Sequence, residues 1–334
     1  MRSESGAPSA PRDPLVFAVG CPRSGTTLLQ RILDNHPALA VANDTHFVPR
    51  CLKRWSRAAH ADALAGRDVP LTRELVAVVR GYRRFERLGI GDAAVERAAV
   101  RSATYAQFVG ALYEELAEIR GKRHGGEKTP DYVRNLPLLH ALFPASRFVH
   151  IVRDGRDVAL SLLEWSSPQK GPGKLAYWSV DPLAVAILWW RWQVLSGRDA
   201  ARDLSLEVYC EIDYDAMVLD PAAHAVELCA FLGLDYEPTM VAYHEGKVRD
   251  DAGLNAKDAW LPPTTGLRDW RTQLSRDDQA LFELLAGDLR NALGHEPGCA
   301  DPSSSVLRRA AESRAWFDGE LRRKAQKDAR EDDD

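Results

Sequence analysis

The stretch that decides the fold is GCPRSGTT, residues Gly20–Thr27, in which two glycines frame a short loop. The residues before it, Pro14–Gly20 (PLVFAVG), are a short apolar run ending in glycine, which is typical of a buried parallel strand. After the loop, Thr26–Asn35 carries leucine and isoleucine at helical spacing. In such a strand, loop and helix, successive backbone N–H groups and the helix N-terminus converge on an anion. The sequence therefore predicts a phosphate-binding loop at residues 20–27.

The loop lacks the lysine of nucleoside triphosphate P-loops. Thr26-Thr27 stands where that motif has Lys-Ser or Lys-Thr, and the lysine is needed to neutralise the β- and γ-phosphates. The cation inside the loop is Arg23. We therefore expect a phosphate-like ligand without the usual magnesium–triphosphate arrangement, and an ordinary turn between strand and helix is the alternative.

A second anion-binding element is predicted at Arg147–Ser161 (RFVHIVRDGRDVALS). The run Arg147–Val152 predicts a strand, so Arg153 lies at its carboxyl end, where open α/β sheets bind ligands. Ser161 follows about two helical turns later and can join the guanidinium in holding a phosphate. The alternative is a salt-bridged turn, which would explain the residues that lie between them, Asp154, Arg156 and Asp157.

The rest of the chain continues the alternation of strands and helices. A strand is expected at 204–209 and a helix at 221–232 that stops at Gly233, while 50–121 is helical throughout. The pattern predicts an α/β fold with a parallel sheet flanked by helices, a largely helical insertion and a helical C-terminal part. We expect a flexible tail at 1–13, one domain at 14–300, and a charged helical extension with an acidic tail at 301–334. The Pro- and Gly-rich segment 166–181 is a candidate lid.

Composition excludes several classes of protein. The chain has 334 residues, 45% hydrophobic and 28% charged, as in globular proteins, and its net charge of −4 argues against a general nucleic-acid binder. It has no apolar run of transmembrane length and its first residues lack the apolar centre of a signal peptide. The five cysteines lack metal-site spacing. We therefore expect a cytoplasmic protein with reduced thiols, no membrane anchor and no metal.

Taken together, the two anion-binding strings resemble those of the sulfotransferases that use 3′-phosphoadenosine 5′-phosphosulfate (PAPS). Pro22–Leu33 is similar to the family's 5′-phosphosulfate loop, and Phe148–Ser161 to its 3′-phosphate element. The resemblance covers roughly residues 14–275 and is strongest to the bacterial and tyrosylprotein branches. It implies a P-loop-like parallel α/β domain that moves a sulfuryl group from PAPS to a hydroxyl of a small molecule, glycan or peptide. The product would be adenosine 3′,5′-bisphosphate.

The resemblance also assigns the nucleotide-binding residues. The 5′-phosphosulfate would be held by the loop residues Arg23, Ser24, Gly25, Thr26 and Thr27. Arg153 and Ser161 would hold the 3′-phosphate, and Tyr214 in YDAMVLDP would contact the nucleotide. The late cofactor loop, within 255–270, aligns poorly and receives no assignment.

The catalytic residues are carried over in the same way. Asp44, in NDTHF, falls on the position of the catalytic carboxylate, and Lys128, in EKTPDY, on the family's lysine. Lys128 would stabilise the leaving phosphate together with Arg23, and Asp44 would accept the acceptor proton. His46 is the rival base, because its ordinary pKa of about 6.5 suits proton transfer near neutrality. Tyrosylprotein members carry a basic residue where this chain has Trp165, which weakens a protein-tyrosine interpretation.

Two other functions stay open from the sequence, a P-loop kinase or NTPase and a nucleotide-binding module without catalysis. The acceptor and the oligomeric state are not determined by the sequence. An aromatic-rich stretch offers candidates for an acceptor pocket in Trp165, Tyr177 and Trp178, whereas Trp189 and Trp192 share a helical face and are expected in the core.

Overall fold

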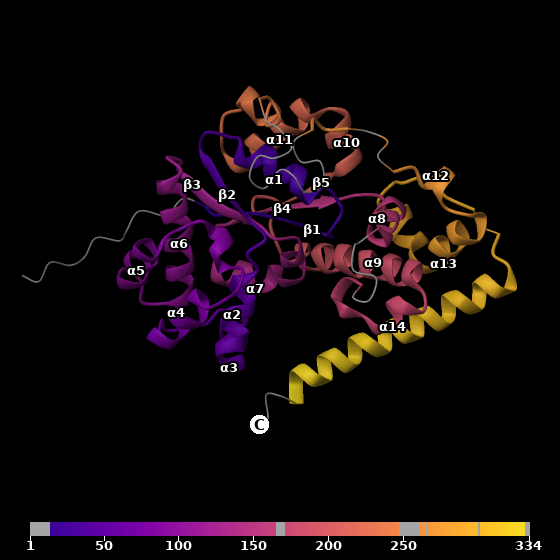
Figure 1. Cartoon of the computed structure of the whole chain (residues 1–334), viewed down its shortest axis with the longest axis horizontal. Coiled ribbons are helices and arrows are strands. Elements are labelled where there is room, and N and C mark those ends of the chain that lie inside the picture. Colours follow the sequence, from indigo (N-terminus) through magenta and orange to yellow (C-terminus); the bar gives the residue numbers. More distant parts are fainter. Residues whose placement is uncertain are drawn as a thin grey trace, which may run out of the picture.

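A parallel five-stranded sheet forms the centre of the molecule (Figure 1), in a computed structural model that describes residues 14–164, 171–246, 261–264, 266, 268–299 and 301–330. The strand order is β2-β3-β1-β4-β5, and every neighbouring pair is parallel. The strands are β1 (Val16–Gly20), β2 (Leu39–Asn43), β3 (His124–Lys128), β4 (Arg147–Val152) and β5 (Tyr209–Asp213). The predicted α/β class is confirmed; the predicted tail at 1–13 lies outside the described residues.

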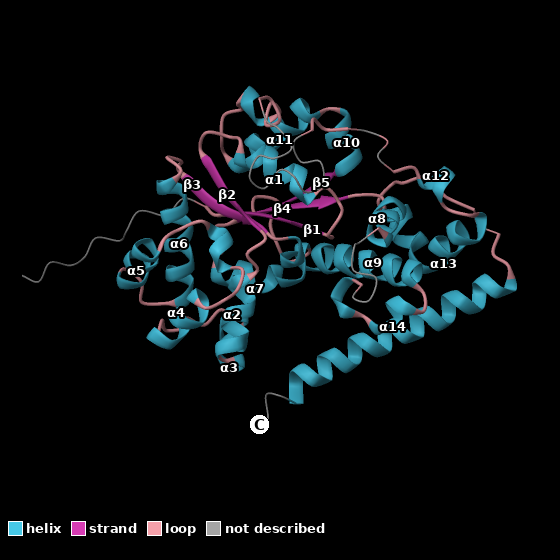
Figure 2. Cartoon of the chain, viewed as in Figure 1, coloured by secondary structure: helices cyan, strands magenta, loops and turns pink. Residues whose placement is uncertain are grey.

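Helices connect and cover the strands (Figure 2). The α-helices are α1 (Thr26–Asp34), α2 (Phe47–Trp55), α3 (Arg57–Leu64), α4 (Arg73–Arg80), α5 (Asp92–Val100), α6 (Tyr105–Ile119), α7 (Leu136–Leu142), α8 (Gly155–Leu163), α9 (Pro182–Ala201), α10 (Tyr214–Leu219), α11 (Pro221–Leu232), α12 (Trp270–Gln273), α13 (Arg276–Ala292) and α14 (Ser304–Arg330). Short 3₁₀ helices are η1 (Phe85–Leu88), η2 (Pro130–Asn135), η3 (Pro172–Lys174), η4 (Ala176–Ser179) and η5 (Pro238–Met240).

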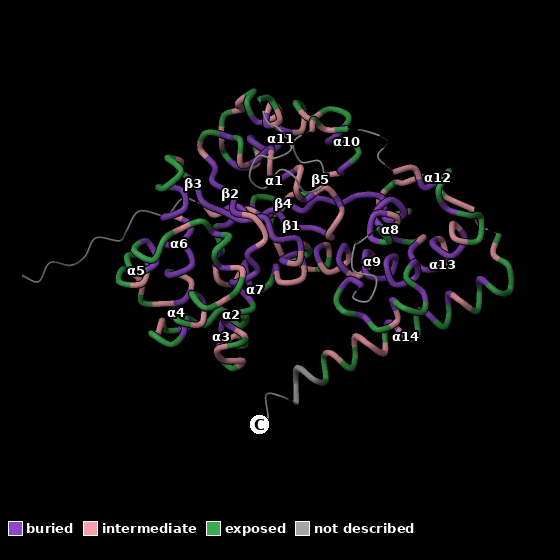
Figure 3. The backbone as a smooth tube through the Cα atoms, in the orientation of Figure 1, coloured by how far each residue is buried: buried purple, intermediate pink, exposed green. Residues whose placement is uncertain are grey.

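Strands β1 to β4 are almost wholly buried, as Figure 3 shows by its colour, whereas the edge strand β5 is mostly half-buried or exposed. Successive residues of β1 belong to different cores: Val16 and Ala18 pack with α1, α10 and α11, whereas Phe17 and Val19 pack with α2 to α7. This alternation follows from the two-residue period of a strand. It explains why β1 is a continuous apolar run rather than an alternating one.

Two strands were not predicted, and one was placed wrongly. The predicted strand at 204–209 begins instead at Tyr209, because 204–208 form turns. In β3 the residues Gly125 and Gly126 have low strand propensity, yet a Cβ there would lie 2.2 Å from the Tyr113 carbonyl oxygen and 2.1 Å from that of Val16. Close packing thus requires glycine at these two positions. Because glycine has a low strand propensity, the sequence did not predict β3.

The helical insertion is confirmed, since α2 to α6 and η1 occupy residues 47–119. The C-terminal helix α14 packs along α9 and α13 at the lower edge of the molecule in Figure 1. Tyr177 stacks on Trp316 of this helix, with 4.7 Å between ring centroids, and Trp178 is buried in the same core. These two aromatics therefore belong to the core that contains the C-terminal helix, and Trp165, the third candidate for the acceptor pocket, lies outside the described residues.

Candidate active site

The predicted phosphate-binding loop connects β1 to α1 at the carboxyl edge of the sheet. The Ser24 amide donates to the Cys21 carbonyl oxygen at 3.1 Å, which closes the loop. Gly25 has a φ of 88°, and a Cβ on it would lie 2.2 Å from the Tyr214 ring. Only glycine fits that conformation and that contact. The helix then begins at Thr26 with no side-chain cap, so its first N–H groups are available to an anion.

The second predicted element lies against this loop. Arg153 follows β4 directly, and Ser161 is on α8. The Arg23 side chain, whose residue has a φ of 80°, donates from Nε to the Ser161 Oγ at 2.9 Å. The two elements that the sequence placed 138 positions apart therefore share a hydrogen bond.

Arg153 is held from two sides. Its guanidinium lies 4.4 Å from the centroid of the Tyr214 ring, and Nη2 donates to Asp157 at 3.3 Å. Its Nε is buried and has no hydrogen-bond partner among the described residues. A cation kept in place with an unsatisfied donor is prepared for a further anionic partner.

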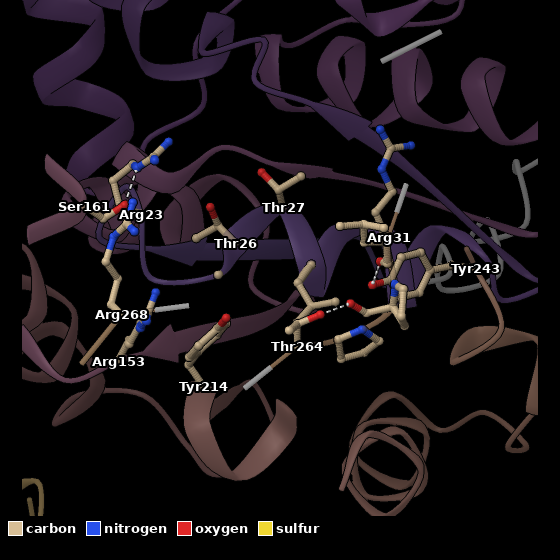
Figure 4. A pocket seen from close by; sticks show the side chains of 15 residues that line it. Arg23, Thr26, Thr27, Arg31, Arg153, Ser161, Tyr214, Tyr243, Thr264 and Arg268 are labelled. Atoms are coloured by element: carbon tan, nitrogen blue, oxygen red, sulfur yellow. Dashed lines mark hydrogen bonds between the residues drawn. The ribbon is translucent and has the colours of Figure 1, made fainter. Parts of the chain in front are cut away.

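Between these elements lies a cavity of about 290 Å³ (Figure 4). Its described lining includes four arginines and no carboxylate; the residues are Arg23, Gly25, Thr26, Thr27, Leu28, Arg31, Arg153, Ser161, Tyr214, Tyr243, Leu261, Pro262, Pro263, Thr264 and Arg268. The pKa of Arg23 is lowered by burial and then by the neighbouring charges of Arg268 and Arg153, against the opposing effect of Glu164. This concentration of positive charge in a partly buried space fits a ligand with several negative charges.

Sequence reasoning found most of this lining and missed part of it. Arg31 lies one helical turn after Thr27 on α1, so helical periodicity could have indicated it. Arg268 also lines the cavity and lies in the segment that was left unassigned. Two residues later, Trp270 is held by Arg156, which is distant in sequence and whose guanidinium stacks 3.5 Å from the centroid of the Trp270 ring. Ser24, which the resemblance also assigned to the nucleotide, does not line the cavity, and its amide donates within the loop.

The predicted catalytic residues form a second cluster, where β2 and β3 end. Asn43 pairs with Lys128, and Lys128 pairs in turn with Ala18 of β1, so this cluster lies at the same edge as the loop. Lys128 Nζ lies 3.4 Å from Asp44 Oδ1, and His46 Nε2 lies 3.8 Å from the same oxygen. The three residues that the resemblance assigned to catalysis therefore lie close together, although none of them lines the cavity described above.

Burial lowers the pKa of two members of this cluster, Lys128 and His46. It lowers the pKa of Lys128, while the nearby negative charges of Asp44 and Glu127 oppose that change. It also lowers the pKa of His46 to about 4, against the opposing charges of Asp131 and Asp44. His46 is therefore neutral at pH 7 and a much weaker base than an exposed histidine.

The geometry agrees with a comparison of sequences, in which the Sulfotransferase family matches residues 14–238. The chain belongs to this family. It is 22% identical over 298 residues to protein-tyrosine sulfotransferase A of Caenorhabditis elegans, covering 87% of this chain and 69% of that one. It is 27% identical over 253 residues to protein-tyrosine sulfotransferase 2 of Gallus gallus, covering 72% and 57%.

A solved structure, the sulfotransferase domain from the curacin biosynthetic pathway, has the same fold, with a TM-score of 0.52 and 19% identity, covering 86% of this chain and all of that one. The sulfotransferase is thus a transferase of sulfuryl groups, and its family uses PAPS. Among the described residues, no helix is long and apolar enough to cross a membrane.

Proposed function

We propose that this sulfotransferase moves the sulfuryl group of PAPS to a hydroxyl group of its acceptor and releases adenosine 3′,5′-bisphosphate. The observation that carries this proposal is the cavity with four arginines between the loop at 20–27 and the residues Arg153 and Ser161. PAPS carries negative charge at both ends of one nucleoside. Two cationic elements joined by the Arg23–Ser161 hydrogen bond match such a ligand better than one phosphate-binding loop alone.

The residues present fit the nucleotide. The Arg153 Nε is a buried donor without a partner among the described residues, and glycine at position 25 lets the Tyr214 ring pack against the loop, since a Cβ there would lie 2.2 Å from that ring. PAPS, when bound, supplies the sulfuryl group. Arg23 and the first N–H groups of α1 would hold the 5′ end, with Thr26 and Thr27 adding hydroxyls. Arg153 and Ser161 would hold the 3′-phosphate, and Tyr214 would contact the nucleoside.

In the chemical step, Lys128 and Asp44 act as a pair. Lys128, protonated, would stabilise the negative charge that develops on the leaving phosphate. Asp44, 3.4 Å from Lys128, would take the proton of the acceptor hydroxyl as general base. His46 is the alternative base, and its lowered pKa counts against it.

The acceptor site is expected to be cationic. Arg87 donates to the Asp44 carbonyl oxygen at 3.4 Å, and Arg50 lies 3.6 Å from Asp131, which itself lies 3.9 Å from His46. Burial and the charge of Arg87 lower the pKa of Arg84, while Asp44 opposes this change. We infer an acceptor with a negative group beside its hydroxyl. A tyrosine flanked by acidic residues is one candidate, because the relatives are named protein-tyrosine sulfotransferases.

Paired acceptors test this preference. A tyrosyl peptide flanked by aspartate should have a kcat/KM about tenfold above the same peptide flanked by asparagine, the size of one charged hydrogen bond. The difference should shrink in Arg50→Gln. Equal values of kcat/KM for the two peptides would refute the proposal of an anionic acceptor, and the proposed nucleotide chemistry would stand.

Thermal shift separates the proposed function from its rivals. A ligand that binds the folded state raises stability by RT ln(1 + [L]/Kd), so adenosine 3′,5′-bisphosphate should raise the Tm and ATP with Mg²⁺ should not. The reverse result would favour a P-loop kinase. Turnover of sulfur-labelled PAPS against a panel of hydroxyl acceptors then distinguishes an enzyme from a module that only binds the nucleotide.

A further inference from the structure

Glu127 is a fully buried carboxylate with an unusual number of hydrogen-bond donors, and it lies beside the proposed catalytic pair. Its Oε1 accepts from the Thr45 amide at 2.8 Å, the Thr45 hydroxyl at 2.6 Å and the His46 amide at 3.2 Å, and also from the Thr129 hydroxyl. Its Oε2 accepts from the Tyr113 and Tyr132 hydroxyls at 2.5 and 3.3 Å. Such a site, with two backbone donors on one oxygen, is built for an ionised carboxylate.

Three of these donors belong to the turn that carries the proposed base. Asp44 and His46 have φ values of 61° and 60°, in the left-handed region that is unfavourable for residues other than glycine. Thr45, between them, is fully buried and gives both its amide and its hydroxyl to Glu127. A turn in this conformation persists only where its surroundings impose it, and Glu127 accepts three hydrogen bonds from it.

The next residue of β3 completes the arrangement. The Asp44 amide donates to the Lys128 carbonyl oxygen at 2.7 Å, and the Lys128 ammonium lies 3.4 Å from the Asp44 carboxylate. Glu127 and Lys128, which are consecutive residues of β3, therefore both contact this turn. Glu127 accepts hydrogen bonds from the backbone of the turn, and the Lys128 ammonium lies beside the Asp44 carboxylate. A change in the Glu127 contacts would move Asp44 relative to Lys128.

We propose that Glu127 is a positioning residue, which holds the Asp44–His46 turn so that the Asp44 carboxylate stays beside Lys128. It touches neither reacting atoms nor the nucleotide cavity, so its effect on catalysis passes through Asp44 and Lys128. The proposal rests on the proposed function for its kinetic consequence, whereas its geometric consequence can be measured without any activity.

Two variants of one buried network provide the test. Glu127→Gln keeps the shape of the side chain but removes the charge, so the three donors of the turn lose their ionised acceptor. Tyr113→Phe is the matched control, because it removes one donor from the other oxygen of the same carboxylate and leaves the turn's donors in place. Both variants should lower the Tm, so loss of stability does not distinguish the two roles.

The geometric readout is a crystal structure of each variant. In Glu127→Gln we expect the Asp44–Lys128 separation to exceed 4 Å and the turn to leave the left-handed region, whereas in Tyr113→Phe both should stay as in the wild type. An unchanged turn in Glu127→Gln would overturn the proposal. This readout decides the question even if the wild type proves unable to transfer a sulfuryl group, which would refute the proposed function separately.

The kinetic readout uses PAPS and the acceptor found by the panel. Glu127→Gln should lower kcat by about 10- to 100-fold with the KM for PAPS unchanged within twofold, and Tyr113→Phe should keep kcat within twofold. The charges that act on Lys128 are Asp44, Glu127 and Arg31, so loss of the Glu127 charge should also move the alkaline limb of kcat to lower pH. A purely structural role would give Glu127→Gln and Tyr113→Phe the same kcat.

If Glu127→Gln does not fold, Thr45→Val carries the test, since it removes a single hydroxyl donor from the turn. We expect a three- to tenfold loss of kcat, and a result equal to that of Tyr113→Phe would overturn the proposal.

Discussion

The phosphate-binding loop at residues 20–27 and the Asp44–His46 turn lie at the same edge of the sheet but are built differently. The loop takes its shape from its glycines, from a hydrogen bond between Ser24 and Cys21, and from Arg23, which has a φ of 80° and donates to Ser161. The turn uses non-glycine residues in the left-handed region and is held by Glu127, which lies 82 positions after Thr45.

This difference implies that nucleotide binding and catalysis depend on separate sets of contacts. The loop should bind its anion as long as its own sequence and the arginines around it are intact, because a helix N-terminus and nearby cations suffice. The turn should lose its conformation when β3 is disturbed, even if the loop is intact. Substitutions at the two regions should therefore change affinity and rate independently.

The largest effect is expected from Gly25→Ala, which attacks the loop. A Cβ would meet the Tyr214 ring at 2.2 Å with φ at 88°, so the response of the Tm to adenosine 3′,5′-bisphosphate should disappear. Gly66→Ala is the control, because its φ is 73° but nothing lies within 4 Å of the new Cβ. It should lose about 1–2 kcal/mol of stability from backbone strain and keep the response. A response in Gly25→Ala as large as that in Gly66→Ala would mean that the contact of Gly25 with Tyr214 does not decide binding.

The next effect concerns the turn. Asp44→Asn should lower kcat by a factor of 10² or more, because the amide cannot take the acceptor proton, while the affinity for the bisphosphate stays within about threefold. Steady-state kinetics and calorimetry measure the two quantities. His46→Gln should reduce kcat much less. A nearly normal rate in Asp44→Asn together with an inactive His46→Gln would make His46 the base.

Sequence alone predicted the loop and Arg153 well because their patterns are short and contiguous. β1, β4 and the helix at 221–232 agree with the structure for the same reason: an apolar run, or a helix that ends at Gly233, is a local signal. Asp44, Lys128 and His46 came only from resemblance to a family, since nothing in their spacing brings them together.

The features that were missed depend on distant contacts. β3 contains two glycines because neighbouring carbonyl groups leave no room for a Cβ, and propensity cannot reveal that. Glu127 acts through donors on α6, on η2 and on the turn after β2, and that turn lies 82 positions away along the chain. Arg268 reaches the cavity from a segment without a regular pattern. Such contacts are properties of the packed fold.

A smaller effect tests which phosphate Arg153 holds. Arg153→Lys keeps the charge but loses the planar fork and the stacking on Tyr214, where the guanidinium lies 4.4 Å from the ring centroid. The Kd for adenosine 3′,5′-bisphosphate should rise about tenfold, in line with one charged hydrogen bond. The Kd for adenosine 5′-phosphate, which lacks the 3′ group, should hardly change. A similar loss for both nucleotides would assign Arg153 to the 5′ end.

The smallest effect is a flat pH profile. Because burial lowers the pKa of His46 to about 4, kcat should vary less than about twofold between pH 5.5 and 7.5, without the inflection near 6.5 of an ordinary histidine. At His46 the unfolded chain binds more protons than the folded one between pH 6.5 and 4, so the contribution of this residue should make the Tm fall as the pH is lowered through that range. His46→Gln should weaken this fall of the Tm and leave the profile of kcat unchanged. An inflection near 6.5 that vanishes in His46→Gln would transfer the proton-accepting role from Asp44 to His46.

On the alkaline side, the lowered pKa of Lys128 should reduce kcat at a pH below the ordinary lysine value of about 10.4, because the ammonium loses its proton there.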